Sequence, residues 1–228
     1  MLEIVRKMDK AVLFDFDWTL AIMGVDWVRL SKRMRLFFKK YGVDFKGNES
    51  IKGSYGLARE LGKKGYDVEK ILSCAHRIIK EEELVGARKT KRVRGSKKLI
   101  ERLRTRFPLG IVTNNSVEAL NVALKKVGLS KKDFGVIITR NARSELKPSP
   151  QPILAAIKRL PPAIKVVYMV GDESADILTA KAAGKILKRR KKIVTIGFPG
   201  WMGRSALVAA KPDYIIDRLD EIIRILDK

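Results

Sequence analysis

The stretch AVLFDFDWTL, residues 11–20, decides the fold because it joins a buried strand to two closely spaced acids. Of its first six residues, AVLFDF, only Asp15 is not apolar, which predicts a strand covered on both faces. Asp15 and Asp17 lie two positions apart and should point to the same side of the chain. Two carboxylates this close resist burial unless a cation compensates their charge. The stretch therefore predicts a cation site; the alternative is that both acids only end a strand and cap a turn.

Length and composition indicate a globular chain without a membrane segment. The 228 residues are 46% hydrophobic, enough for one large domain or a domain with a modest insertion. There is no run of roughly 18 uncharged apolar residues, and the first ten residues lack the apolar core of a signal peptide. We therefore expect a cytoplasmic protein. The single Cys74 excludes an internal disulfide and should be buried, and the single His76 excludes multi-histidine metal sites and should face solvent.

The charge is strongly unbalanced, with 49 Lys and Arg against 25 Asp and Glu and a net charge of +24. Basic residues concentrate at 88–106 and in the run KRRKK at 188–192. One interpretation is a solvated surface of a heat-adapted protein, and the other is contact with nucleic acid. Without interleaved aromatic residues or a nucleic-acid motif, we favour the first. A field of this sign attracts anionic substrates in either case.

Residues 21–91 show helical rather than strand periodicity. The apolar side chains expected on one face of the first helix are Trp27, Leu30, Met34, Phe37, Phe38 and Tyr41. Two further helices are expected over 51–61 and 68–84, separated by turn residues. The segment therefore resembles a small all-helical insertion after the first strand.

From residue 95 onward, helical stretches alternate with apolar strands. Strands are expected over 108–115, 134–139, 165–172 and 191–198. Alternation at this spacing predicts an α/β fold with a doubly wound, mostly parallel sheet covered on both faces. Ligands of such sheets bind at the carboxyl ends of the strands.

Polar side chains gather at these expected strand ends. They are Asp15, Asp17 and Thr19 after the first strand, Thr113 and Asn114 after the second, and Asp172, Glu173 and Asp176 after the fourth, with Lys147 between the third and fourth. An aspartate can attack phosphorus to give an acyl phosphate, and Mg²⁺ prefers carboxylate and phosphate oxygens. A lysine and a threonine suit the oxygens of a transferred phosphoryl group. The set therefore favours phosphoryl transfer to a carboxylate.

Four motifs carry a resemblance to a known family: DFDWTL (15–20), TNN (113–115), KP (147–148) and GDESAD (171–176). In this order they resemble the haloacid dehalogenase superfamily, close to the phosphoglycolate phosphatase type. The resemblance implies an α/β core formed by residues 1–21 and 92–228 and a helical cap formed by residues 22–91.

The same resemblance implies roles for individual residues. Asp15 would be the nucleophile, and Asp17 the general acid that protonates the leaving oxygen and then activates water. Thr113, the Asn114 backbone and Lys147 would hold the phosphoryl group. Mg²⁺ would be bound by Asp15, the main-chain carbonyl of Asp17, Asp172 and Asp176.

Two details refine the expectation within the family. Asp17 indicates phosphate esters rather than carbon–halogen bonds as the substrates. Trp18 stands where the family usually has glycine, and the indole could stack on a substrate or only pack at the hinge of the cap. Residues of the cap that could select the substrate are Lys52, Ser54, Tyr55 and Arg59.

We therefore expect a Mg²⁺-dependent phosphatase that hydrolyses a small phosphorylated metabolite through an aspartyl-phosphate intermediate. Two alternatives remain open. One is a phosphomutase of the same fold, which would keep every catalytic residue. The other is a basic nucleic-acid-binding protein with a secondary phosphatase site, supported by the two basic stretches. The sequence does not determine the oligomeric state.

Overall fold

The strand expected at the start of the chain forms the centre of a parallel sheet. In the computed structural model, which describes residues 9–46, 52–142, 145–200 and 203–228, β1 (Lys10–Phe14) lies between β4 (Leu109–Val112) and β6 (Val166–Gly171). The other strands of this sheet are β5 (Val136–Ile138), β7 (Lys192–Gly197) and β8 (Tyr214–Ile215). Among the described residues, the order is β5-β4-β1-β6-β7-β8 and every pairing is parallel.

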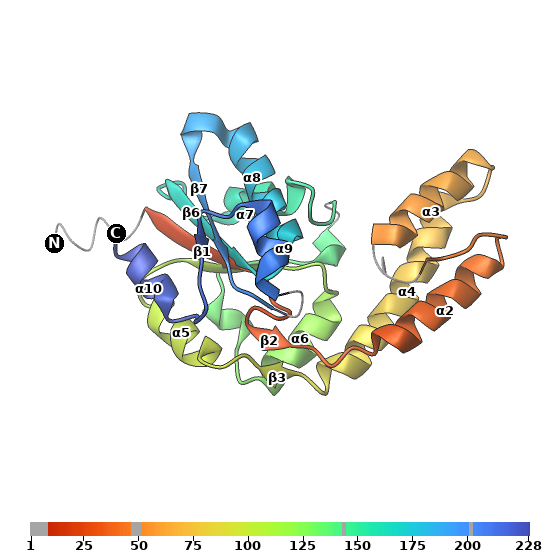
Figure 1. The fold of residues 1–228 in the computed structure, drawn as a ribbon, viewed down its shortest axis with the longest axis horizontal. Helices are drawn as coiled ribbons and strands as arrows, with labels where there is room; N and C mark the ends of the chain where they lie inside the picture. The colour runs from red at the N-terminus through yellow and green to blue at the C-terminus, as the bar shows by residue number, and fades with distance from the viewer. Residues whose placement is uncertain (1–8, 47–51, 143–144, 201–202) are drawn as a thin grey trace.

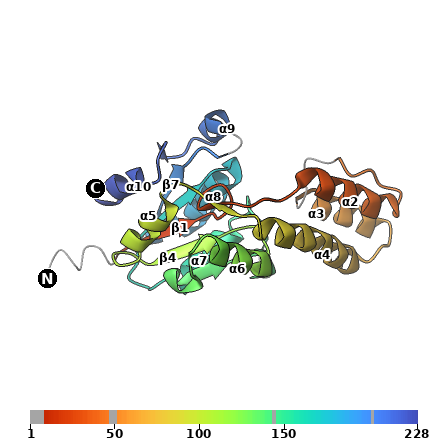
Figure 2. The same ribbon diagram turned by 90° about the horizontal axis from the view of Figure 1, so that it is seen from below.

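Helices cover both faces of the sheet (Figures 1 and 2). They are α5 (Ser96–Leu103), α6 (Val117–Lys126), α7 (Gln151–Arg159), α8 (Ser174–Leu187), α9 (Gly203–Ala210) and α10 (Glu221–Leu226). Alternation along β1 divides the core, because Val12 and Phe14 pack with α5, α6 and α10, whereas Ala11 and Leu13 pack with α7 and α8. Helix α9 packs on α8 through Leu207 and Ile177. The expected doubly wound α/β class is confirmed.

The strand order reverses direction at β1. The chain runs outward from β1 through β4 to β5, then returns to the other side of β1 with β6 and continues to β7 and β8. In sheets of this kind the crevice at the reversal, beyond the carboxyl ends of the strands, is where ligands bind. The strand ends that meet there are those of β1, β4 and β6.

A helical segment is inserted between β1 and α5, and it lies to one side of the sheet (Figure 1). It contains α2 (Trp27–Lys39), α3 (Lys52–Lys63) and α4 (Val68–Ala87). Its apolar cluster includes Leu30, Met34 and Phe38 of α2, which belong to the predicted stripe, and Ile71 of α4. Trp27, also in the stripe, is 45% exposed. The domain boundaries at residues 22 and 91 stay a prediction.

Two short strands, which the sequence did not reveal, close the base of this segment. β2 (Ala21–Ile22) and β3 (Lys91–Arg92) pair antiparallel, with Ala21 opposite Arg92. Strands of two residues are too short to show the alternation by which strands are recognised. They bring the entry and the exit of the helical segment side by side.

Helices α2 and α4 begin with aspartate caps. Asp26 accepts a hydrogen bond from the Arg29 N–H at 2.9 Å, and Asp67 accepts one from the Lys70 N–H at 3.0 Å. A cap of this kind contributes about 1 kcal/mol to helix stability. No described helix is both long and apolar enough to cross a bilayer.

The two basic stretches lie on different parts of the molecule. Residues 188–192 form a 3₁₀ turn and the start of β7, which is the amino edge of the sheet, opposite the acidic strand ends. Residues 88–106 follow α4 and include β3 and α5. The run at 188–192 therefore lies at the opposite end of the sheet from the acidic residues.

Trp18 occupies a turn in which a side chain causes backbone strain. Its φ angle is 58°, in the left-handed region, and its N–H donates to the Ala21 carbonyl at 2.6 Å. An L-residue with a Cβ is strained in this conformation, whereas glycine adopts it freely. The turn therefore has a backbone that suits the glycine expected from the resemblance.

We predict that Trp18→Gly is more stable than Trp18→Ala by about 1 kcal/mol, because both lose the indole but only glycine relieves the strain. Urea unfolding of both variants measures the difference. Leu178, a 47% exposed residue within α8, provides the control, since glycine there should be less stable than alanine by about 1 kcal/mol. The same order of stability at both positions would contradict the strain.

Candidate active site

The candidate site lies at the carboxyl edge of the sheet, where β1, β4 and β6 end. Asp15 directly follows β1, Thr113 follows β4 and Asp172 follows β6. All three are buried, with at most 7% of their surface exposed. The Asp15 N–H still donates to the Val170 carbonyl of β6 at 2.8 Å, so the sheet itself positions this residue.

Lys147 is the centre of the charged side chains. Its Nζ lies 2.6 Å from Asp15 Oδ1 and 2.5 Å from Asp176 Oδ1, and all three residues are buried. Burial alone would lower the pKa of Lys147, but the charges of Asp15 and Asp176 raise it. The lysine therefore stays protonated and bridges the two carboxylates.

The side chain of Asn114 holds the lysine backbone in place. Asn114 Oδ1 accepts a hydrogen bond from the Lys147 N–H at 3.1 Å, and its Nδ2 donates to the Lys147 carbonyl at 3.5 Å. The expected motifs at 113–115 and 147–148 are thus directly joined. The peptide bond between Lys147 and Pro148 is cis.

Three carboxylates surround a space suited to a cation. Each of Asp15, Asp172 and Asp176 offers an oxygen within 4.8 Å of the others. Burial raises the pKa of Asp15 to about 7, although Lys147 opposes the shift, and burial followed by the charges of Asp15 and Asp176 raises that of Asp172 to about 9. Asp172 Oδ2 is buried and has no hydrogen-bond partner among the described residues. One lysine therefore leaves the acidic charge under-compensated, and an orphaned carboxylate oxygen is the donor that a hard divalent cation prefers.

Small residues make room for these carboxylates. A Cβ on Gly171 would overlap with Asp176, and one on Gly200 would lie 2.8 Å from Asp172 Cβ. Gly171 continues β6 and pairs with Gly197 of β7. Glycine is therefore required at this position by the close approach of Asp176.

The Asp17 carboxylate is not among the three that approach one another within 4.8 Å, although Asp17 closely follows Asp15 in the sequence. Its Oδ1 accepts hydrogen bonds from the Met23 N–H at 2.8 Å and the Trp18 N–H at 3.1 Å. Burial raises its pKa to about 7, while these two hydrogen bonds oppose the shift. The carboxylate therefore faces the turn that leads into the helical segment, and its predicted metal contact through the main-chain carbonyl stays a prediction.

The threonine after β4 is held by its own loop. Thr113 Oγ1 lies 2.6 Å from Asn115 Oδ1 and accepts a hydrogen bond from the Asn115 N–H at 3.3 Å. Asn115 is buried, and sequence reasoning gave it no role. Thr19 was also given none, yet its buried hydroxyl lies 3.4 Å from Asp172 Oδ1.

The structure also shows a buried ion pair next to this loop that the sequence did not reveal. Arg140 follows β5, and its guanidinium binds Glu83 of α4 at 2.7 and 2.8 Å. The two residues are 57 positions apart, and neither belongs to a motif. No pattern in the sequence could have joined them.

The residues expected to select the substrate lie on α3 or at its start. Arg59 is exposed and Tyr55 is half-buried, whereas Ser54 is buried; the side chain of Lys52 lies outside the described residues. The Tyr55 ring lies 5.2 Å from that of His76. His76 is half-buried with its Nε2 enclosed, against the expectation that it faces solvent, because its ring packs against that of Tyr55.

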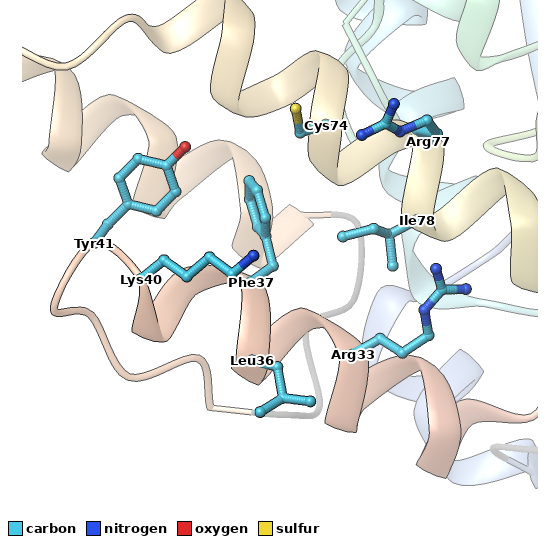
Figure 3. Close-up of a pocket in the computed structure, with 8 residues that line it drawn as sticks. All are labelled: Arg33, Leu36, Phe37, Lys40, Tyr41, Cys74, Arg77 and Ile78. Carbon is cyan, nitrogen blue, oxygen red and sulfur yellow. The ribbon is translucent and has the colours of Figure 1, made fainter.

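A groove of about 450 Å³ lies elsewhere, between α2 and α4 (Figure 3). Its lining includes Phe37, Tyr41, Arg77 and Cys74. Cys74 is only partly buried, against expectation, because it lies at this groove rather than in the helical core. None of the residues at the strand ends lines the groove.

Comparisons with known proteins identify the family of the chain. The family model of the haloacid dehalogenase-like hydrolases matches residues 12–186. The pyrophosphatase PpaX of Bacillus mycoides is 32% identical over 124 residues, which are 54% of this chain and 53% of the relative. The phosphoglycolate phosphatase of Neisseria meningitidis is 36% identical over 116 residues, 51% of this chain and 47% of the relative. The matches thus span about half the length of these relatives.

Solved structures share the fold along nearly the whole chain. CbbY from Rhodobacter sphaeroides, solved in complex with phosphate, has a TM-score of 0.65 at 21% identity and covers 96% of this chain and 99% of its own. A haloacid dehalogenase-like family hydrolase from Streptococcus pneumoniae has a TM-score of 0.61 at 18% identity, covering 96% and 99%. With a family model that matches most of its length, the chain belongs to the haloacid dehalogenase-like hydrolase family.

Proposed function

We propose that the protein is a Mg²⁺-dependent phosphatase that hydrolyses a small phosphorylated metabolite through an aspartyl-phosphate intermediate. The observation that carries the proposal is Lys147 Nζ between Asp15 and Asp176, together with the buried Asp172 Oδ2, which no described residue hydrogen-bonds. This arrangement combines a nucleophilic carboxylate, a fixed positive charge and an oxygen-lined cation site. Relatives named as a phosphoglycolate phosphatase and a pyrophosphatase support the same class of chemistry.

Asp15 is the proposed nucleophile because the sheet fixes its backbone and Lys147 fixes one of its oxygens. A carboxylate oxygen of Asp15 attacks phosphorus, the ester oxygen leaves with a proton, and an acyl phosphate remains on Asp15. Water then attacks the phosphorus of this acyl phosphate, and inorganic phosphate and the free carboxylate are released. Lys147 keeps the carboxylate oriented through both steps.

Asp17 is the proposed acid and base. Its pKa of about 7 allows it to hold a proton for the leaving oxygen and to accept one from the attacking water at neutral pH. Both of its hydrogen bonds from described residues fall on Oδ1. Its second oxygen can therefore carry the proton without loss of the turn at Trp18.

The phosphoryl oxygens have donors on two loops. We assign this role to Thr113, the Asn114 backbone and Lys147, because their positions are joined by the hydrogen bonds of the Asn114 side chain. Mg²⁺ would be held by Asp15, Asp172 and Asp176, with the Asp17 carbonyl as a further ligand. When bound, the ion would neutralise the carboxylates and bind the phosphate of the substrate.

Substrate size and selection would come from the helical segment. We propose that α2–α4 act as a cap over the strand ends, with Tyr55, Arg59 and Trp18 as candidates for substrate contact. The net charge of +24 would increase the encounter rate with any anionic phosphate ester.

The first test is release of inorganic phosphate from an aryl phosphate with and without Mg²⁺. Asp15→Asn is expected to lower turnover by at least roughly 1,000-fold, because the nucleophile is lost. Asp217→Asn, which removes an exposed carboxylate with a side-chain exposure of 75%, is the control and should keep wild-type turnover. A wild type that is inactive on this ester and on a broad metabolite panel would overturn the proposal.

The second test measures metal binding by thermal unfolding. Mg²⁺ at about 100 times its dissociation constant should stabilise the wild type by about 2.7 kcal/mol, and Asp172→Asn should lose this gain. Glu173→Gln changes the adjacent acid, which lies outside the three-carboxylate group, and should keep most of the gain. Equal Mg²⁺-dependent shifts of Tm in all three proteins would place the ion elsewhere.

The third test separates the role of Asp17 by leaving group. An alkoxide needs a proton to leave and nitrophenolate does not, so Asp17→Asn should slow the first turnover of an alkyl phosphate by roughly 100- to 10,000-fold and that of nitrophenyl phosphate far less. With nitrophenyl phosphate, rapid-quench measurement of Asp17→Asn should show a burst of nitrophenol. The acyl phosphate accumulates in this variant because the base that activates water is also lost. Equal slowing of both esters would contradict an acid role.

A further inference from the structure

The Glu83–Arg140 ion pair connects the helical segment with the loops of the candidate site. Glu83 lies near the end of α4, and Arg140 lies in the turn that follows β5. The guanidinium and the carboxylate meet in a bidentate pair of 2.7 and 2.8 Å, with side-chain exposures of 4% and 2%. The pair is therefore removed from water at the junction of two parts of the chain.

Stability alone does not explain such a pair. Removing two charges from water costs free energy that their attraction often only balances, so an apolar pair of similar size would serve packing as well. What a bidentate pair provides beyond packing is a fixed geometry. The question is which groups this geometry holds.

The pair holds the backbone of residues 114–116, which lead from β4 into α6. Arg140 Nη1 donates to the Asn114 carbonyl at 2.7 Å, and the Ser116 N–H donates to Glu83 Oε2 at 3.1 Å. The Arg140 N–H also donates to the Asn115 carbonyl at 3.1 Å. Each of the three residues after Thr113 is thus bound by one member of the pair.

The same contacts extend to the lysine of the site. Arg140 holds the backbone of Asn114, and the side chain of Asn114 accepts a hydrogen bond from the Lys147 N–H at 3.1 Å. Lys147 in turn contacts Asp15. A continuous series of hydrogen bonds therefore runs from Glu83 through Arg140 and Asn114 to Lys147.

Helix α4 packs in two different cores. Ile71 and Ile79 belong to the apolar cluster of the helical segment, whereas Ala87, at the end of the helix, belongs to the core between the sheet and α5, α6 and α10. Glu82, next to Glu83, binds Arg29 and Arg33 of α2. Neighbouring acids on one helix therefore serve different partners: Glu82 binds within the segment, and Glu83 binds the site loops.

We infer that Glu83 and Arg140 are positioning residues for residues 113–116, the phosphoryl-binding loop after β4. Through this ion pair, the orientation of α4 fixes Asn114 and Lys147. This inference rests on the proposed phosphatase function. The pair touches no reacting atom, and its effect passes through the backbone of residues 114–116. Misplacement of a lysine that acts in the transition state lowers kcat more than it raises KM.

The test compares Glu83→Gln and Arg140→Lys with the matched control Glu82→Gln. All three weaken an ion pair of a buried glutamate, but the arginines that bind Glu82 are 37–48% exposed, and only the first two variants reach residues 114–116. We expect the first two to lower kcat roughly 10- to 100-fold with a smaller change in KM, and the control to stay within about threefold of wild type. Activity is measured well below each variant's Tm, so that loss of folded protein does not enter.

Hydrogen exchange of the peptides that cover residues 113–117 gives a readout independent of activity. The Ser116 amide, which donates to Glu83, should exchange faster in Glu83→Gln than in the wild type. In Glu82→Gln its exchange rate should equal that of the wild type. If the wild type has no phosphatase activity, the proposed function fails while this exchange still tests the positioning. Wild-type kcat together with wild-type exchange in folded Glu83→Gln and Arg140→Lys would overturn the inference.

Discussion

The structure depends on one electrostatic constraint, the burial of three carboxylates around a single lysine. Asp15, Asp172 and Asp176 approach one another within 4.8 Å, and Lys147 contacts two of them. Burial and mutual repulsion raise the pKa of Asp15 and Asp172, so the folded chain holds these groups against their preference for water. A chain selected only for stability would avoid such a cluster. Its presence at the switch point of a parallel sheet, where ligands bind, makes a functional origin the simplest physical account.

The sheet can position only part of this cluster. Asp15 and Asp172 directly follow strands, and their backbones inherit the order of β1 and β6. Lys147 follows no strand directly, and its backbone is held by a side chain, that of Asn114, in place of ladder hydrogen bonds. Loops that carry charge need such support because their own backbone groups have no regular partners. Precision at the site therefore comes from two sources, the strand ends and the side chains that brace the loops.

This division explains what the sequence could and could not predict. Buried strands show as apolar runs, and the residues that follow them could be assembled at one edge from topology alone. β2, β3 and α9 were not predicted, since two-residue strands carry no period and α9 is a short helix at the end of the sheet. The Glu83–Arg140 pair was missed because it joins residues distant in sequence, and no periodicity records a single contact of this kind. The left-handed backbone of Trp18 became visible only as a dihedral angle, although the unusual residue at that position was noticed.

The two crossings between sheet and helical segment are each tied by a carboxylate at the site. At the first crossing, Asp17 accepts the Met23 N–H just after β2. At the second, Glu83 accepts the Ser116 N–H just before the chain returns through β3. β2 and β3 pair with each other, so the connections cannot shift independently. The helical segment is therefore oriented by the same loops that carry the proposed acid and the proposed phosphoryl-binding groups. A change in that orientation would first displace Asp17 and residues 114–116, and only through them Asp15 and Lys147.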